Sequence, residues 1–466
     1  MRILLINIAL RPPPSRVYPP IGLGYIASAM KRAGFSFDLL DLDIQPKAPE
    51  EVENFLRTNR YDVVAMGCIV TGYKFVKWLS RIVKENYPES TIVVGNSVAS
   101  SIPVLLLQKT GVDIAVLGEG DETIVELLKT IEDKRELGGV RGIAYKIDGE
   151  VKITPHRPII PDINVIPIPD WDLFDIEAYI ENQSKALDEP LPPIPRDQLR
   201  SFVINTARGC LHNCTFCYHV FQGEKYRWRS VESIIGELEY HNNRYDINHF
   251  YFHDELSFFS VKQAEEFANA MLAKRLKIYW AASCRSGLFT KEEHLEVAKK
   301  LKEVGGLALS FSLESTSPEI LQRMHKNVGP LEFSQQVKIC KRAGLAVHTS
   351  LVIGYPEETP ETIKATIDCC IDNGVYPSIG YLLPQPGTPM YDYARQHKYI
   401  QDEEEYLLSM GDRQDLHVNM TKIPDQELEA IVKDEMARAN RALGMDLQPD
   451  SLIKTSFYRT KSKPEE

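Results

Sequence analysis

The sequence predicts an α/β protein with two parallel sheets in tandem, a doubly wound sheet followed by a partial (β/α)6 barrel of the TIM type. Short β-branched runs alternate with amphipathic segments over residues 1–135, and the same alternation returns over residues 201–400. This alternation is typical of parallel sheets, because each parallel connection needs a crossover, usually a helix. A group of three cysteines directly follows the first strand of the second series.

The first series consists of five β/α units. Strands are expected at 3–6, 37–40, 63–66, 92–94 and 114–116. Amphipathic helices are expected at 23–33, 50–58, 73–86, 101–109 and 122–131. In an open sheet of this kind, ligands bind at the carboxyl ends of the strands.

Small and polar residues follow these strands. Glycine lets the backbone approach a flat ligand, and hydroxyl or amide side chains can satisfy its polar edge. The candidate cofactor-binding residues of this domain are Pro20, Gly22, Leu23, Val70, Thr71, Gly95, Asn96, Ser97, Gly118, Glu119 and Gly120. A plain nucleotide site is the alternative, although the G-x-G-x-x-G fingerprint is absent after the first strand.

Two segments outside the β/α series complete the chain. Residues 136–200 are expected to form a hairpin around Asp148-Gly149 and then a linker or strap with eight prolines after residue 157, docked by Trp171 and Phe174. Residues 401–466 are expected to form a small helical cap over the substrate site, with a long helix near 425–442. The polar tail from Lys454 is expected to be mobile.

The second series contains six strand candidates, and in a barrel the reacting groups lie at the carboxyl ends of its strands. The candidates are 202–206, 249–254, 277–283, 307–313, 346–353 and 376–382. Cys210, Cys214 and Cys217 follow the first of them in a C-x3-C-x2-C spacing. Three thiolates can hold a four-iron four-sulfur (4Fe-4S) cluster and leave one iron open. The alternative is a zinc knuckle completed by His212 or His219, but the paired C-x2-C arms of such sites are absent.

Composition excludes several other classes of protein. The 466 residues carry a net charge of −11, which argues against a groove that binds nucleic acid through its phosphates. No apolar run approaches the ~20 residues of a membrane span, and no signal peptide is recognisable. The other five cysteines are scattered, so we expect a cytoplasmic protein without disulfides.

The cysteine spacing, with Phe216 before the third cysteine, resembles the radical S-adenosylmethionine (SAM) superfamily. The resemblance implies that the open iron binds the amino and carboxylate groups of SAM, which is cleaved to methionine and a 5′-deoxyadenosyl radical. His253-Asp254-Glu255 stands where the family has G-G-E, and an acid there can hold the methionine ammonium. The implied SAM-binding residues are Phe216, Asp254, Glu255, Glu314, Ser315, Ile353 and Gly354.

Three residues are candidates for catalysis. Arg285 follows the third strand and could pair with the methionine carboxylate or with substrate, although a structural salt bridge is an equal alternative. Tyr218 and Tyr355 could transfer a proton near the substrate, and packing is the alternative for each. Tyr355 belongs to a G-Y-P-E-E-T segment that the resemblance places beside adenine, and a P-G-T-P-M-Y segment follows the sixth strand.

The P-P-I-G-L-G and G-E-G-D-E segments of the first series resemble the cobalamin-binding domain of cobalamin-dependent radical SAM enzymes. Many cobalamin proteins supply a histidine to cobalt, but no histidine precedes His156 here. The resemblance therefore implies cobalamin in a base-off, histidine-off state. Gly95-Asn96 stands where the family usually has two glycines, so the neighbouring contacts differ.

The resemblance implies a transferase, a cobalamin-dependent radical SAM methyltransferase of class B. One SAM would methylate cobalamin, and the radical from a second would remove hydrogen from an unactivated carbon that then receives the methyl group. A peptide or protein side chain ranks slightly ahead of lipids, tetrapyrroles and antibiotic precursors as substrate, and ferredoxin or flavodoxin is the expected electron donor. The alternatives are a cobalamin-linked radical cyclase or rearrangement enzyme and a non-catalytic cobalamin or redox sensor. A methylthiotransferase is disfavoured, because only Cys68 precedes Cys210.

Overall fold

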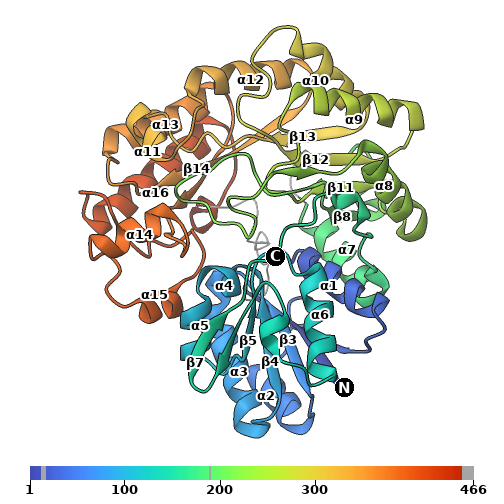
Figure 1. The fold of residues 1–466 in the computed structure, drawn as a ribbon. Coiled ribbons are helices and arrows are strands. Elements are labelled where there is room, and N and C mark those ends of the chain that lie inside the picture. Colours follow the sequence, from blue (N-terminus) through green and yellow to red (C-terminus); the bar gives the residue numbers. More distant parts are fainter. Residues whose placement is uncertain (12–16, 188–189, 454–466) are drawn as a thin grey trace, which may run out of the picture.

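Two largely parallel sheets form the frame of the molecule, as the sequence predicts (Figure 1). The computed structural model describes residues 1–11, 17–187 and 190–453. The first sheet and its helices, blue to teal in Figure 1, lie below an arc formed by the second sheet and its helices, green to orange. The predicted mobile tail from Lys454 lies outside the described residues.

The first sheet has seven strands in the order β2-β1-β3-β4-β5-β6-β7. Its strands are β1 (Ile3–Asn7), β2 (Asp38–Asp41), β3 (Val63–Gly67), β4 (Thr91–Gly95), β5 (Ile114–Val116), β6 (Ile143–Ile147) and β7 (Glu150–Ile153). β1 to β5 are parallel, while β6 and β7 form the predicted hairpin and extend the sheet antiparallel beside β5. All five predicted strands are confirmed within two residues at each end.

Helices cover both faces of this sheet because successive strand residues point to opposite sides. Ile3 and Leu5 of β1 pack with the helices of one face, whereas Leu4 and Ile6 pack with those of the other. The first group is α1 (Ile21–Arg32) and α6 (Asp121–Glu132). The second group is α2 (Pro49–Thr58), α3 (Tyr73–Asn86), α4 (Asn96–Ser101) and α5 (Pro103–Lys109).

The second sheet is a partial barrel of six parallel strands in the order β15-β14-β13-β12-β11-β8. They are β8 (Ser201–Ile204), β11 (His249–Phe252), β12 (Tyr279–Ser283), β13 (Gly306–Ser310), β14 (Ala346–Ile353) and β15 (Pro377–Tyr381). Its helices are α8 (Val231–Tyr245), α9 (Val261–Lys274), α10 (His294–Glu303), α11 (Pro318–Arg323), α12 (Pro330–Arg342) and α13 (Pro360–Asp372). Phe252 stacks on Trp280 at 5.4 Å in the core between these helices and strands.

The proline-rich segment differs from the prediction of a strap without regular structure. It contains α7 (Ile176–Lys185), which Asp175 caps by accepting a hydrogen bond from the Ala178 amide at 3.2 Å. Tyr179 of α7 donates a hydrogen bond to Asp41 at the end of β2, at 2.7 Å, while Ile180 is buried in the core that contains β8. The helix therefore connects the two sheets. Trp171 and Phe174 are buried, as predicted.

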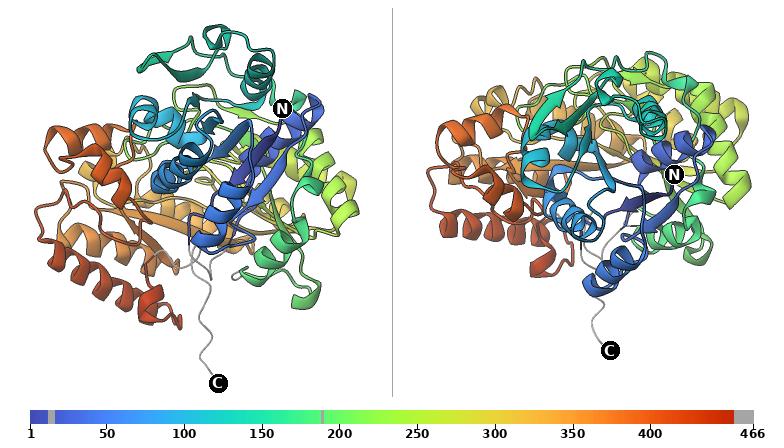
Figure 2. Two further views of the ribbon diagram at one scale, coloured as in Figure 1. Left: turned by 90° about the horizontal axis from the view of Figure 1, so that it is seen from below. Right: turned by 60° about the horizontal axis from the view of Figure 1, so that its bottom comes forward.

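The C-terminal region contains α14 (Pro389–Gln396), α15 (Glu403–Ser409) and α16 (Asp425–Ala442), and α16 confirms the predicted helix. α16 packs against α13, and Figure 2 shows these red helices beside the orange segments of the second sheet. α15 packs against α3, where Glu404 accepts a hydrogen bond from Tyr73 at 3.0 Å. None of the helices that the structure describes is both long and apolar enough to cross a membrane.

Candidate functional site

One cavity of about 860 Å³ lies where the strand ends of the two sheets face each other. The first sheet contributes strand-end residues such as Asn7, Gly67 and Gly95, and the second contributes Ser283 and His348. Both series of predicted ligand-binding ends therefore open into the same space. A molecule in this cavity can contact a group held by each sheet at once.

The cysteine loop leaves the short strand β9 (Ala207–Arg208), which pairs with β10 (Arg227–Trp228). Thr215 anchors the loop, because its hydroxyl donates to the Arg323 carbonyl at 2.9 Å and lies 2.8 Å from the Tyr355 hydroxyl. Its amide donates to the Met324 carbonyl at 3.2 Å. The loop is thus held by two later segments of the barrel.

The three cysteines suit a cluster better than a single ion. Among the residues that the structure describes, no group of three or more His, Cys, Asp or Glu side chains closes around one metal ion. In a 4Fe-4S cluster each thiolate binds its own iron, so the sulfurs stand farther apart than around one zinc ion. Burial raises the pKa of Cys214 to about 11. Cys217 is accessible to solvent.

The two acids after β11, Asp254 and Glu255, have different surroundings. Asp254 accepts hydrogen bonds from the Thr206 amide at 2.7 Å and the Ala207 amide at 3.1 Å, so it braces the chain that leads into the cysteine loop. Glu255 also lines the cavity and is accessible to solvent. An ammonium group nearby would favour the ionised form of Glu255. Glu255 is therefore the better candidate to hold the methionine ammonium.

Three glycines on the first-sheet side give the cavity a wall of bare backbone. A Cβ atom placed on Gly22, Gly67 or Gly95 would meet no atom within 4 Å. The residues present therefore fit a large flat ring that approaches the strand ends. The other predicted cobalamin contacts that line the cavity are Pro20, Leu23, Asn96, Gly118, Glu119 and Gly120.

The remaining predicted contacts of this domain are Val70, Thr71 and Ser97. The Val70 amide donates to the Ser97 hydroxyl at 2.9 Å, so the two residues tie the β3 and β4 loops together. Neither these two nor Thr71 is among the described residues that line the cavity. The histidines that line it are His253 and His348, both in the second half of the chain. The histidine-off state of cobalamin stays a prediction.

Glu119 has a structural partner that the sequence analysis missed. Arg208 donates to Glu119 and to both carboxylate oxygens of Asp121, at 2.8 and 3.0 Å for Asp121. Arg227 Nη1 lies 3.0 Å from each Glu119 oxygen. These four residues, called the ion-pair cluster below, join the loop between β5 and α6 to the chain two residues before Cys210. In the sequence, the two acids and the two arginines stand in separate segments. Their opposite charges are the only feature of the sequence that could have indicated this contact.

The predicted SAM contacts after β13 are buried near the cysteine loop. Glu314 adopts a left-handed backbone with φ of 65°. One of its carboxylate oxygens lies 3.4 Å from Lys326 Nζ, and the other is buried without a hydrogen bond in the described structure. A buried carboxylate oxygen without a partner is costly, and a hydroxyl group of a ligand would satisfy it. The Ser315 hydroxyl accepts from the Ser317 amide at 3.2 Å. Ile353 and Gly354 are also buried.

The candidate catalytic residues do not line the cavity. Tyr355 is fully buried, and its ring packs edge-on against Phe216 at 6.4 Å between centroids. Tyr218 packs over Gly387, where a Cβ atom would lie 2.6 Å from its ring. The Arg285 side chain is exposed. Tyr218 and Tyr355 therefore pack beside the cysteine loop. The catalytic roles of Tyr218, Arg285 and Tyr355 stay predictions.

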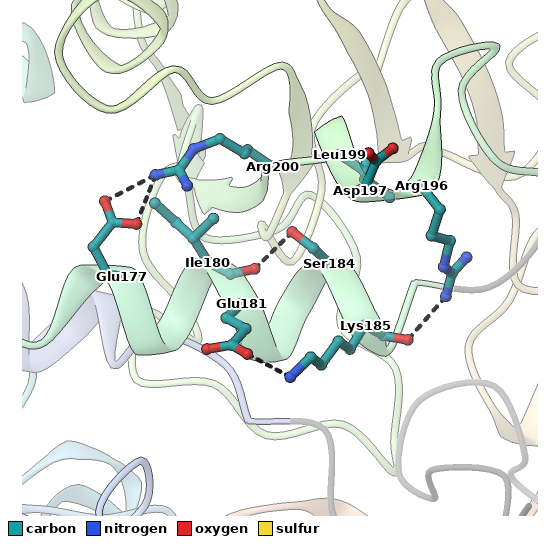
Figure 3. A pocket seen from close by; sticks show the side chains of 9 residues that line it. All are labelled: Glu177, Ile180, Glu181, Ser184, Lys185, Arg196, Asp197, Leu199 and Arg200. Atoms are coloured by element: carbon teal, nitrogen blue, oxygen red, sulfur yellow. Dashed lines mark hydrogen bonds and ion pairs between the residues drawn. The ribbon is translucent and has the colours of Figure 1, made fainter.

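The surroundings of the site have two further features. No described residue after Ser350 lines the cavity, although Asp412 of the C-terminal region pairs with the lining residue Arg11 at 3.1 Å. The C-terminal cap stays a prediction. A second hollow of about 400 Å³ lies beside α7 (Figure 3). Its charged groups bind one another: Arg200 donates to both Glu177 oxygens at 2.8 Å, and Lys185 pairs with Glu181. It is separate from both sets of strand ends.

Family comparisons match the two halves of the chain separately. The B12 binding domain matches residues 14–128, and the radical SAM superfamily matches residues 204–370. The two matches cover the first sheet and the cysteine-bearing barrel, respectively. The chain belongs to the cobalamin-dependent radical SAM enzyme family. The cofactors of this cobalamin-dependent radical SAM enzyme are a 4Fe-4S cluster, SAM and cobalamin.

Proteins similar to this cobalamin-dependent radical SAM enzyme are named for different reactions. It is 29% identical to the "Uncharacterized methyltransferase PH0819" of Pyrococcus horikoshii, over 98% of this chain and 95% of that protein. It is 25% identical to the anaerobic magnesium-protoporphyrin IX monomethyl ester cyclase of Cereibacter sphaeroides, over 84% and 62% of the two chains. The solved structure of the methyltransferase TsrM from Kitasatospora setae has a TM-score of 0.65 at 18% identity, over 86% and 77% of the two chains. That similarity shows a shared fold.

Proposed function

We propose that this enzyme transfers a methyl group to an unactivated carbon of its substrate. The observation that carries the proposal is the single cavity that the strand ends of both sheets line. When bound, the cluster with SAM supplies a carbon-centred radical that removes a hydrogen atom, and cobalamin supplies the methyl group. The substrate must contact both cofactors, and a shared cavity is the arrangement that this requires.

The residues of the chain would bind, orient and enclose these groups. Cys210, Cys214 and Cys217 would hold the cluster, and Glu255 would receive the ammonium group of SAM as a charge-assisted hydrogen bond. The bare backbone at Gly67 and Gly95 would lie against the corrin ring. The ion-pair cluster would keep the β5–α6 loop at a fixed position relative to the cysteine loop, which excludes water between them.

The resemblance to PH0819 supports methyl transfer, because that alignment spans nearly all of both chains. The acceptor that we favour is a peptide or protein side chain, with a ferredoxin or flavodoxin as electron donor. A radical cyclase or rearrangement reaction is the second candidate. The similarity to the Cereibacter sphaeroides cyclase favours it, since 84% of this chain aligns with that enzyme.

The test is anaerobic reconstitution with iron, sulfide and hydroxocobalamin, followed by SAM, a reductant and a cell extract as substrate source. Mass spectrometry then measures 5′-deoxyadenosine and S-adenosylhomocysteine. Both products support radical methyl transfer, whereas 5′-deoxyadenosine alone supports the cyclase or rearrangement reaction. Cobalamin retention without either product supports a sensor. A Cys214→Ser variant should lose both products, while the matched Cys369→Ser variant on α13 should keep them.

A further inference from the structure

The barrel wall of the cavity is made of hydroxyl and imidazole side chains. Ser283 of β12, Ser310 of β13 and His348 of β14 lie side by side in the strand register, and all three line the cavity. The Tyr251 hydroxyl extends this row, at 3.3 Å from the Ser283 hydroxyl. Two residues farther along the chain from Ser310 and His348, Ser312 and Ser350 also line the cavity, with their hydroxyl oxygens 2.9 Å apart.

This wall differs from the interior of a filled barrel, where layers of Val, Ile and Leu occupy the space inside the strands. Here the bulky residues of the same strands, such as Phe250, Trp280 and Leu309, are buried in the apolar core. The small inward side chains leave room for a ligand to enter between the strands. The barrel is therefore open and polar where a substrate would contact it.

A polar wall of this kind selects for a hydrogen-bonding ligand. When a ligand displaces water, each hydroxyl left without a partner costs about 1–3 kcal/mol. A hydrocarbon placed against this wall would incur this cost at Ser310, whereas the Ser283 hydroxyl lies 3.3 Å from the Tyr251 hydroxyl. A site built to hydrogen-bond its substrate therefore rejects an apolar one strongly.

The charges of the cavity wall disfavour an anionic ligand. Five carboxyl side chains and two guanidinium groups line it, and no lysine is among the described lining residues. Both guanidinium groups bind carboxylates: Arg208 belongs to the ion-pair cluster, and Arg11 Nε lies 3.1 Å from Asp412. Among the described lining residues, phosphate or several carboxylates would meet no cation that is not already paired with a carboxylate. Asp43 lines the same cavity, and a cationic group beside it would favour its ionised form and pair with it.

We propose that the acceptor is a hydrophilic molecule, uncharged or cationic, whose hydrogen-bonding groups bind Ser283, Ser310 and His348 inside the barrel. This inference rests on the proposed methyl transfer and specifies its substrate class. Lipids and polyanions such as phosphorylated compounds or tetrapyrrole carboxylates fall outside this class. Neutral and basic peptide side chains fall within it.

The first experiment uses the reconstituted enzyme with reductant and SAM that carries a deuterated methyl group. A cell extract is separated into lipid, anionic, neutral and cationic fractions, and mass spectrometry finds which compounds gain one deuterated methyl. Label in the neutral or cationic fraction is the expected result. Label confined to the lipid or anionic fraction, or in no fraction while S-adenosylhomocysteine forms, overturns the inference. Absence of S-adenosylhomocysteine contradicts the proposed function instead.

A binding measurement tests the inference without turnover. The same fractions are added to the reconstituted protein without reductant, and its melting temperature is followed. The neutral or cationic fraction should raise the melting temperature of the wild type but not of Ser310→Val, which removes one hydroxyl and narrows the barrel. Thr91→Val on β4, outside the cavity lining, is the matched control and should behave as the wild type. Stabilisation only by lipids or anions, or an equal response of Ser310→Val, overturns the inference.

Discussion

Replacement of Arg208 by methionine should destabilise the contact between the two sheets. The Arg208 side chain is 12% exposed and binds Asp121 through two nitrogen atoms and Glu119 through one. Burial opposes its charge, but the bonds to Asp121 and Glu119 raise the pKa of Arg208 above its usual value. Arg208→Met keeps much of the side-chain volume and removes the charge, so the two carboxylates lose a counter-ion.

The expected loss in the free energy of unfolding depends on which carboxylate is left without a partner. Removing one member of a buried ion pair typically costs 3–5 kcal/mol, because the other charge stays buried and uncompensated. Here Arg227 remains 3.0 Å from both Glu119 oxygens, so Glu119 keeps a cation. Asp121, with a side chain 13% exposed, is the group that loses its partner. We therefore expect a loss near the lower limit, about 3 kcal/mol.

Urea unfolding of the reconstituted protein, followed by circular dichroism under anaerobic conditions, measures this loss. The matched control is Arg81→Met, which breaks the pair with Glu85 on α3. Both side chains of that pair are more than half exposed, so the control should lose less than about 1 kcal/mol. Combining Arg208→Met with Asp121→Leu should recover part of the stability, because no buried charge is then left alone. A loss for Arg208→Met as small as that of Arg81→Met, with no recovery in the double variant, would refute the reasoning.

Three further changes test other parts of the site. Cys214→Ser should lose the bound iron, measured colourimetrically, while the apoprotein stays folded; unchanged iron content would contradict the cluster assignment. Thr215→Val removes the hydroxyl that contacts Arg323 and Tyr355, and we expect a loss of about 1–2 kcal/mol in urea unfolding together with faster iron release to a chelator; iron release at the wild-type rate would argue against an anchoring role. Burial raises the pKa of Glu358 to about 7 from its ordinary 4.5, so the folded state binds the proton more tightly, and this stabilisation is present below pH 4.5 and lost as pH rises to 7. The wild type should lose up to about 3 kcal/mol over that range and Glu358→Gln should not; equal pH dependence of the two would exclude this origin.

The strands and the cysteine loop could be predicted because their signals are local. β3 is a run of β-branched and apolar residues between polar segments, and the spacing of Cys210, Cys214 and Cys217 is readable in eight residues. α7 could not be predicted from the sequence, because it is a ten-residue helix in a segment with prolines on both sides. Short helices owe their stability to packing more than to their own sequence. The contacts that stabilise α7 lie on β2, where Asp41 is 138 residues from Tyr179, and on β8, which follows α7 in the chain.

The roles of side chains at strand ends also depend on partners that the local sequence does not show. A carboxylate such as Glu119 at the end of β5 fits a cofactor contact and an ion pair equally well in the sequence. Its partner Arg208 lies 89 residues away, so only the folded chain shows which applies. Two cofactors that act on one substrate need a fixed separation, and the sheets that hold them are connected by a long segment. Ion pairs with poor solvent access lose little strength to salt screening, so they suit a contact that must keep this separation constant. Glu119 and Asp121 after β5 thus bind Arg208, two residues before Cys210, and we expect this contact to position the cysteine loop.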